Sequence, residues 1–282
     1  MNGDVANRLS RLIFLGTGTS QGVPVIGCQC QVCASDDFRD QRLRSSVMLE
    51  SQHQRVVVDS GPDFRTQMLR EDVRSMDALV YTHEHKDHVA GMDDVRPFNY
   101  LQNKALPVYA SSRVEQTLRR DFHYAFDPGK HAGVPDVLIH EVTDELNFVA
   151  GGMTWTPLPV MHGNLPIHGY RVENVAYITD ANFIPDETFL RLEGLEVLVL
   201  NALRQSAHYS HFSLDEALSV AEKVGAQQTW LTHVSHLMGN HADIEKGLPE
   251  SVRLAYDGLV LSPTDAGWIS TESSWTESST KS

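Results

Sequence analysis

The stretch Thr82–His88 reads Thr-His-Glu-His-Lys-Asp-His and carries three imidazoles and an aspartate within six residues. Neutral imidazole and carboxylate oxygen are good ligands for divalent metal ions. On a helix, the side chains of His83, His85, Asp87 and His88 would point in different directions, so we expect the stretch to lie on a turn. The alternative is a solvated His-rich loop without a metal. We interpret these four residues as metal ligands.

A second ligand-rich stretch holds the three cysteines of the chain, Cys28, Cys30 and Cys33. An odd number of cysteines crowded into six residues does not suit a disulfide framework. Cysteines on a loop in this C-x-C-x2-C spacing are typical of a metal site, whereas the alternative is that they are small buried hydrophobic residues. We therefore expect them to be metal ligands.

Further candidate ligands follow short apolar runs that the sequence predicts to be strands. These runs cover residues 11–15, 46–49, 56–58, 78–81, 153–158, 175–179, 196–200 and 229–232. Four potential ligands, Asp59, His162, Asp180 and His233, come after such runs. Asp59 is either a plain cap of its strand or a carboxylate that orients a metal-bound histidine. This recurrence predicts layered sheets whose strand ends face one groove, with helices on the outer faces.

Residues 213–225 form the clearest predicted helix. Ser213 is its N-cap, Glu216 completes a capping box, and Gly225 ends it. Residues 64–73 also have a helical pattern. Residues 93–147 are rich in charged and aromatic side chains with weak periodicity, so we expect an insertion that covers the site.

Length and composition predict one large domain. The chain has 282 residues and 41% hydrophobic content, which is enough for a sizeable core. We place the domain at residues 1–261 and expect the Ser/Thr-rich, acidic tail at 262–282 to be disordered. No apolar run reaches the roughly 18 residues of a membrane span, and the first ten residues do not resemble a secretory signal. The expected location is the cytoplasm, without membrane attachment, and a homodimer is left open.

Charge limits the expected partners. The formal net charge is −14, from 37 acidic and 23 basic residues. Such a charge repels a polyanion in the absence of a local basic patch. We therefore expect a small-molecule substrate and disfavour long nucleic acids.

The motif T-H-x-H-x-D-H, the preceding strand that ends in Asp-Ser-Gly, and the later isolated His and Asp residues resemble the metallo-β-lactamase superfamily. The resemblance runs from about residue 11 to about residue 261. Within that superfamily, the sequence G-T-G-T-S-Q-G-V-P at 16–24, the cysteine cluster and L-T-H-V-S-H at 231–236 resemble the phosphoribosyl cyclic phosphodiesterases of phosphonate breakdown.

This resemblance implies an α/β fold, the four-layer αββα sandwich of the metallo-β-lactamase type, with two metals in the groove between the sheets. One implied metal is held by His83, His85 and His162, the other by Asp87, His88 and His233, and Asp180 bridges both. These nitrogen and oxygen ligands suit two divalent ions such as zinc or manganese. The resemblance also implies one structural zinc on Cys28, Cys30, Cys33 and His236, a closed set that leaves no position for water.

The implied enzyme is a binuclear metal-dependent phosphodiesterase. A hydroxide that bridges the metals would attack the phosphorus of a small phosphodiester, a cyclic phosphate of ribose or of a nucleotide. Asp87 and His211 are the expected catalytic residues, and His211 would supply a proton to the leaving group. In related enzymes a histidine precedes a Ser-Leu helix start, and His211 stands one residue off that spacing, so His208 is its rival.

Three other functions fit the sequence less well. A tRNA-processing endonuclease of the same superfamily would need a basic arm to grip RNA, and no Lys/Arg-rich excursion is present in the sequence. A metal-stabilised binding module would need no open coordination positions, so the complete ligand set argues against it. A secreted β-lactamase is disfavoured by His88 and by the expected lack of a signal peptide.

Overall fold

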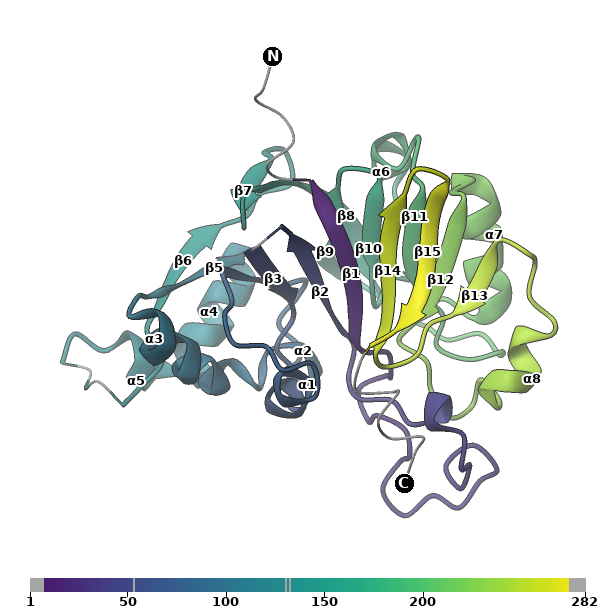
Figure 1. Ribbon diagram of the computed structural model, residues 1–282, viewed down its shortest axis with the longest axis horizontal. Coiled ribbons are helices and arrows are strands. Elements are labelled where there is room, and N and C mark those ends of the chain that lie inside the picture. The colour runs from purple at the N-terminus through teal and green to yellow at the C-terminus, as the bar shows by residue number, and fades with distance from the viewer. Residues whose placement is uncertain (1–7, 53, 130, 132, 274–282) are drawn as a thin grey trace.

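The computed structural model describes residues 8–52, 54–129, 131 and 133–273. In this part of the chain two β-sheets pack against each other, and helices lie on their outer sides (Figure 1). Strands β4 (Ala78–Val80) and β11 (Val197–Asn201) are buried at every position. Continuous apolar runs of this kind are expected for strands that are covered on both faces.

The first sheet has the strand order β15-β14-β1-β2-β3-β4-β5-β6 within the described residues. Its other strands are β1 (Leu9–Gly16), β2 (Ser46–Ser51), β3 (Gln54–Val58), β5 (Leu106–Ala110), β6 (Val137–Glu141), β14 (Leu259–Thr264) and β15 (Gly267–Glu272). Strands β3 to β6 run parallel, and the remaining neighbours pair antiparallel.

The second sheet has the order β13-β12-β11-β10-β9-β8-β7 in the same described ranges. Its other strands are β7 (Phe148–Ala150), β8 (Met153–His162), β9 (Leu165–Val172), β10 (Val175–Ile178), β12 (Gln228–Thr232) and β13 (Val252–Leu254). Strands β7 to β10 form an antiparallel meander, whereas β10 to β13 are parallel.

Two groups of helices cover the sheets. The first group contains α1 (Phe64–Arg70), α2 (Lys86–Val89), α3 (Arg96–Gln102), α4 (Ser112–Asp121) and α5 (His123–Phe126), and the second contains α6 (Asp186–Arg191), α7 (Leu214–Val224) and α8 (His241–Glu245). Short 3-10 turns lie at η1 (Phe38–Asp40) and η2 (Met92–Val95). No helix in the described ranges is both long and apolar enough to cross a membrane.

The buried residues confirm the predicted αββα layering. One core cluster, which includes Phe14, Trp155, Tyr170 and Trp230, joins the facing surfaces of the two sheets. A second cluster packs the first sheet against helices α1 to α5, and a third packs the second sheet against α6 to α8. The apolar faces are therefore buried at three interfaces: between the two sheets, and between each sheet and its helices.

Helix α7 has the predicted capping. The Ser213 side chain accepts from the backbone N–H of Glu216, and the Glu216 carboxylate accepts from the backbone N–H of Ser213 at 2.8 Å. Gly225 follows the helix in the left-handed conformation, at φ 66°. Both ends of the helix thus satisfy backbone groups that would otherwise have no partner.

The expected insertion at residues 93–147 is wrong. The segment contributes β5 and β6 to the first sheet, and α3, α4 and α5 pack on that sheet. Its weak periodicity has a structural reason: β5 alternates buried and half-buried residues, and β6 is the half-exposed outer strand. Neither strand has the continuous apolar run by which the central strands were recognised.

The expected disorder from Ser262 is also wrong for residues 262–272. This segment completes β14 and forms β15, and the two strands pair antiparallel from Leu259↔Glu272 to Thr264↔Gly267. The domain therefore extends at least to Glu272 and not to Leu261. Along β15 only Trp268 is buried, so the strand shows little apolar pattern. Residues 274–282 of the predicted tail lie outside the described part of the chain.

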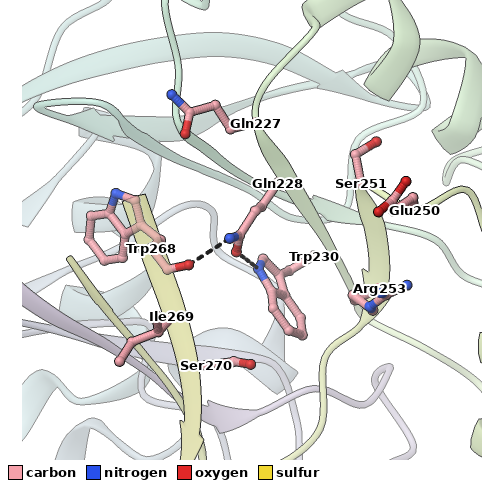
Figure 2. A pocket seen from close by; sticks show the side chains of 9 residues that line it. All are labelled: Gln227, Gln228, Trp230, Glu250, Ser251, Arg253, Trp268, Ile269 and Ser270. Atoms are coloured by element: carbon pink, nitrogen blue, oxygen red, sulfur yellow. Dashed lines mark hydrogen bonds between the residues drawn. The ribbon is translucent and has the colours of Figure 1, made fainter. Parts of the chain in front are cut away.

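Side chains from both sheets hold β15 in place. Figure 2 shows the Gln228 side chain between Trp230 and Trp268: its Nε2 donates to the Trp268 carbonyl at 2.7 Å, and its Oε1 accepts from the Trp230 indole at 3.3 Å. The Trp268 indole also donates to Glu196 Oε2 at 2.8 Å. Gln228, Trp230 and Trp268 line an open pocket of about 850 Å³ between β12, β13 and β15.

Trp268→Ala should lower the free energy of unfolding by roughly 3 kcal/mol, because it removes a large side chain that is only 8% exposed. Denaturant unfolding measures this loss. Ile269→Ala, at a neighbouring side chain that is 50% exposed, is the matched control and should cost about 0.5 kcal/mol or less. Equal, negligible effects of both substitutions would contradict the docking of β15.

Candidate metal centre

The predicted ligands lie at the same end of the sandwich, where strands give way to loops. After β4, the chain turns through Thr82–His85 and enters the short helix α2, which carries Asp87 and His88. The predicted turn is therefore present up to His85. His162 is the last residue of β8, and Asp180 and His233 follow β10 and β12 closely.

The structure brings all seven predicted groove residues together in two sets. His83, His85 and His162 form one set, and Asp87, His88, Asp180 and His233 form the other. Within each set, the potential ligand atoms lie within 4.8 Å of one another. Such convergence of side chains from both sheets is a geometry that can hold two cations.

Asp180 lies between the sets. Its Oδ1 is 3.1 Å from His211 Nε2, and its Oδ2 is 3.1 Å from His233 Nδ1 and 3.3 Å from His88 Nε2. Its side chain also forms a group of potential ligands with His162 and His211. The two carboxylate oxygens therefore face different neighbours, as a bridging carboxylate would.

Three non-glycine residues of the groove have positive φ angles: Asp59 at 65°, Asp180 at 62° and His233 at 56°. The left-handed region is disfavoured for residues with a Cβ and persists where the surrounding structure enforces it. Asp59 and His233 directly follow strands β3 and β12, and Asp180 is the second residue after β10. The backbone thus bends at the points where the chain must turn toward the groove.

A hydrogen-bond network built on Asp59 orients two histidines. The Asp59 carboxylate accepts from the Thr82 backbone N–H at 2.9 Å, the Thr82 hydroxyl at 2.8 Å and His88 Nδ1 at 2.7 Å. Because the hydroxyl proton of Thr82 points to Asp59, its oxygen is free to accept from His83 Nδ1 at 3.0 Å. Of the two roles considered for Asp59, the structure supports the orienting one.

These bonds direct the Nε2 atoms of His83 and His88 into the groove. Both atoms are buried; among the described residues His83 Nε2 has no hydrogen-bond partner, and His88 Nε2 faces the carboxylates of Asp87 at 3.1 Å and Asp180 at 3.3 Å. Similarly, His162 Nδ1 donates to the Ser210 carbonyl at 2.7 Å, which leaves its Nε2 as the free lone pair. Buried unpartnered lone pairs are costly, and a bound cation would satisfy them. The donor set therefore fits divalent metals.

Burial keeps most of these imidazoles neutral. Desolvation lowers the pKa of His83 well below its usual value, lowers the pKa of His162, and takes the pKa of His233 to about 3. Burial would also lower the pKa of His88, but the carboxylates around it, Asp87 first, raise it instead. Neutral imidazole is the form that binds metals, so the environments of His83, His162 and His233 favour ligation near neutral pH, whereas His88 would lose its proton when a cation binds.

Of the two candidate proton donors, His211 is the one that contacts the groove. Its ring centroid lies 4.5 Å from that of His162 and 4.9 Å from that of His233. His208 lies behind it, with the two Nδ1 atoms 3.2 Å apart. The geometry thus favours His211 over His208.

The four predicted ligands of the structural zinc also converge. His236 Nδ1 lies 3.3 Å from Cys28 Sγ and 3.4 Å from both Cys30 Sγ and Cys33 Sγ. A tetrahedral zinc with Zn–S bonds near 2.3 Å and Zn–N bonds near 2.1 Å separates its ligand atoms by roughly 3.6 Å. The spacing fits one such ion, and the set joins the N-terminal loop to the segment after β12.

Sequence reasoning left out two residues that orient ligands, Thr82 and the backbone of Ser210. Thr82 stands inside the recognised motif, so its place beside His83 could have indicated an orienting role. The Ser210 carbonyl is a backbone group, and residue types give no signal for its role. Two buried histidines outside the predicted ligand sets, His168 and His241, are bonded elsewhere, to Asp144 and to Arg42 respectively.

Comparisons with known proteins agree with this architecture. Residues 54–234 match the family described as "Beta-lactamase superfamily domain". A solved structure described as "a New Diphosphatase from the PhnP Family" is similar, with 41% sequence identity and a TM-score of 0.85. The match covers 94% of this chain and 99% of that one.

Two relatives with assigned names are also similar. The octanoyltransferase of Porphyromonas gingivalis is 38% identical over 251 residues, which cover 88% of this chain and 51% of that protein. The chain therefore spans about half the length of this relative. Ribonuclease Z of Mycobacterium sp. (strain KMS) is 24% identical over 225 residues, covering 68% of this chain and 78% of that protein.

Cys30→Ser should remove about one equivalent of zinc and lower the melting temperature, because it breaks a link between distant parts of the chain. Elemental analysis and thermal unfolding measure the two effects, and fully loaded wild-type protein should hold three metals per chain. Gln31→Ala, at an exposed neighbour on the same loop, is the control and should change neither. Full zinc content and full stability in Cys30→Ser would overturn the assignment.

Proposed function

Because this chain belongs to the metallo-β-lactamase superfamily of hydrolases, we propose that it hydrolyses small phosphodiesters in the groove between its sheets. The observation that carries the proposal is the pair of neighbouring ligand sets: Asp180 belongs to one of them and is also grouped with His162 of the other. His83, His85 and His162 would hold one divalent ion, Asp87, His88 and His233 the other, and Asp180 both. Zinc or manganese suits these ligands, and zinc suits the separate Cys3His set.

Two cations in the groove would supply Lewis acidity and lower the pKa of a coordinated water toward neutrality. The chain's own contribution is positioning. The network from Asp59 fixes His83 and His88, and the Ser210 carbonyl fixes His162, so the ligands are oriented before a substrate arrives. Asp87 would take part as a ligand of one cation.

His211 would donate a proton to the leaving group. Its Nε2 faces Asp180 at the centre of the groove, within reach of a phosphate bound there. Its Nδ1 contacts the Ser210 hydroxyl at 3.1 Å and His208 Nδ1 at 3.2 Å. These two contacts hold the ring in place, so that Nε2 can deliver a proton to the departing alkoxide.

Two substrate classes follow from the similarities. Resemblance to the phosphoribosyl cyclic phosphodiesterases favours a cyclic phosphate of ribose or of a nucleotide. The 41% identity to a diphosphatase of the PhnP family supports a diphosphate ester as the second candidate. Both classes present a phosphorus with an oxygen leaving group to the same ligands. The net charge of −14 favours such small anions over a long polyanion.

A substrate panel tests the proposal. Metal-loaded protein should hydrolyse a five-membered cyclic ribosyl phosphate, a nucleoside cyclic phosphate or a nucleoside diphosphate ester with higher kcat/KM than phosphomonoesters or β-lactams. Asp180→Ala should abolish turnover and keep the fold. Because the chain is similar to ribonuclease Z, cleavage of a precursor tRNA is measured alongside the small esters at the same salt concentration. Preferred cleavage of the tRNA, weakening steeply as salt rises, would replace the small-molecule function with a nuclease.

His211→Ala should slow hydrolysis of an ester with a poor leaving group by about 10²- to 10⁴-fold, the usual contribution of a positioned acid. The loss should be smaller for a nitrophenyl ester, because nitrophenolate departs without a proton. Metal content should stay intact, and His208→Ala should have the smaller effect. Equal losses on both esters would assign His211 to phosphate binding instead.

A further inference from the structure

A row of aromatic and imidazole rings leads from the metal groove to solvent. The His211 ring lies 5.1 Å from the His208 ring, which lies 4.7 Å from the ring of Tyr209. His211 and His208 are partly buried, whereas Tyr209 is 84% exposed. Tyr209 therefore stands two ring contacts away from the residue that faces Asp180, and its face is open to a ligand.

Three hydrogen bonds hold the backbone around Tyr209 against the metal-ligand loops. Its carbonyl accepts from Asn182 Nδ2 at 3.3 Å, and Asn182 Oδ1 accepts from the backbone N–H of Gly163 at 2.7 Å. The next residue, Ser210, accepts from His162 Nδ1. The exposed ring is thus attached to a segment whose place is set by the groove itself.

Gly163 forms the turn beside Tyr209. Its φ of 60° favours glycine, and a Cβ built there would lie in ordinary van der Waals contact, at 4.0 Å from Cδ2 and Cε2 of Tyr209 and 3.4 Å from Cβ of Ser210. The Tyr209 ring consequently packs beside the turn after β8, at the edge of the groove. An exposed aromatic side chain contributes little to folding, whereas a ligand that covers it removes apolar surface from water and gains binding free energy.

We propose that Tyr209 is a stacking platform for a planar ring of the substrate, and that the substrate is a nucleotide ester with its base on Tyr209 and its phosphorus at the ligand sets. This inference rests on the proposed function and selects the nucleotide among its substrates. Two ring contacts separate the platform from the reacting centre, which leaves room for a sugar between base and phosphate. Stacking suits any base because each presents a π face.

The experiment compares two substrates that differ in the base alone: adenosine 2′,3′-cyclic phosphate and the 2′,3′-cyclic phosphate of a methyl riboside. Tyr209→Ala should raise KM for the adenosine compound by roughly 5- to 100-fold, the range that stacking energies give. The kcat should change little, and the riboside should be unaffected. Tyr209→Phe should restore the wild-type KM, because stacking needs the ring and not the hydroxyl.

Tyr100→Ala on α3, an exposed tyrosine at 61%, is the control and should alter neither substrate. Equilibrium binding of adenosine monophosphate to the metal-loaded protein gives a second readout that needs no turnover, and Tyr209→Ala should weaken it by a similar factor. If neither cyclic phosphate is hydrolysed but Tyr209→Ala still weakens binding of adenosine monophosphate, the stacking role of Tyr209 is supported and the proposed reaction is wrong. Equal effects on both cyclic phosphates, or none on nucleotide binding, would overturn the platform.

Discussion

The buried carboxylate of Asp59 is the interaction on which the metal groove depends. It is fully buried, desolvation raises its pKa, and it accepts from Thr82 and His88. Through the Thr82 hydroxyl it also fixes the tautomer of His83, so one carboxylate orients a member of each ligand set. Because Asp87 and Asp180 add two further carboxylates nearby, the groove has an excess of negative charge that bound cations would offset.

Close backbone contacts hold the residues of this network in place. Gly61 follows Asp59 and Ser60, and a Cβ at Gly61 would collide with the carbonyl oxygen of Asp87. The Ser60 backbone N–H donates to the His88 carbonyl, and its own carbonyl accepts from Gly91, each at 2.8 Å. The sequence Asp-Ser-Gly therefore has a physical reason: the turn after β3 must touch the helix that carries two of the ligands.

Much of the fold and most of the groove could be predicted because central strands and metal ligands leave strong local signals. Buried strands such as β4 and β11 are continuous apolar runs, and each groove ligand stands at or near the end of a recognisable element. Strands β5, β6 and β15 are among those that were missed, because each buries only some of its residues, so pairing and not composition defines them. The hydrogen bond from His162 to the Ser210 carbonyl could not be predicted, since any residue type offers the same backbone carbonyl.

The cysteine cluster is connected to the groove as well as to the N-terminal loop. His236 of the cluster lies three residues after His233 of the groove, and the segment between them pairs with the loop after β1. Val234 donates to the Thr17 carbonyl at 2.9 Å and accepts from the Thr19 backbone N–H at 3.1 Å. A cation on the cysteines would therefore fix both sides of the turn that holds His233 at its positive φ. With a cation bound, the Cys3His set would thus support the strained backbone at His233 in addition to linking distant parts of the chain.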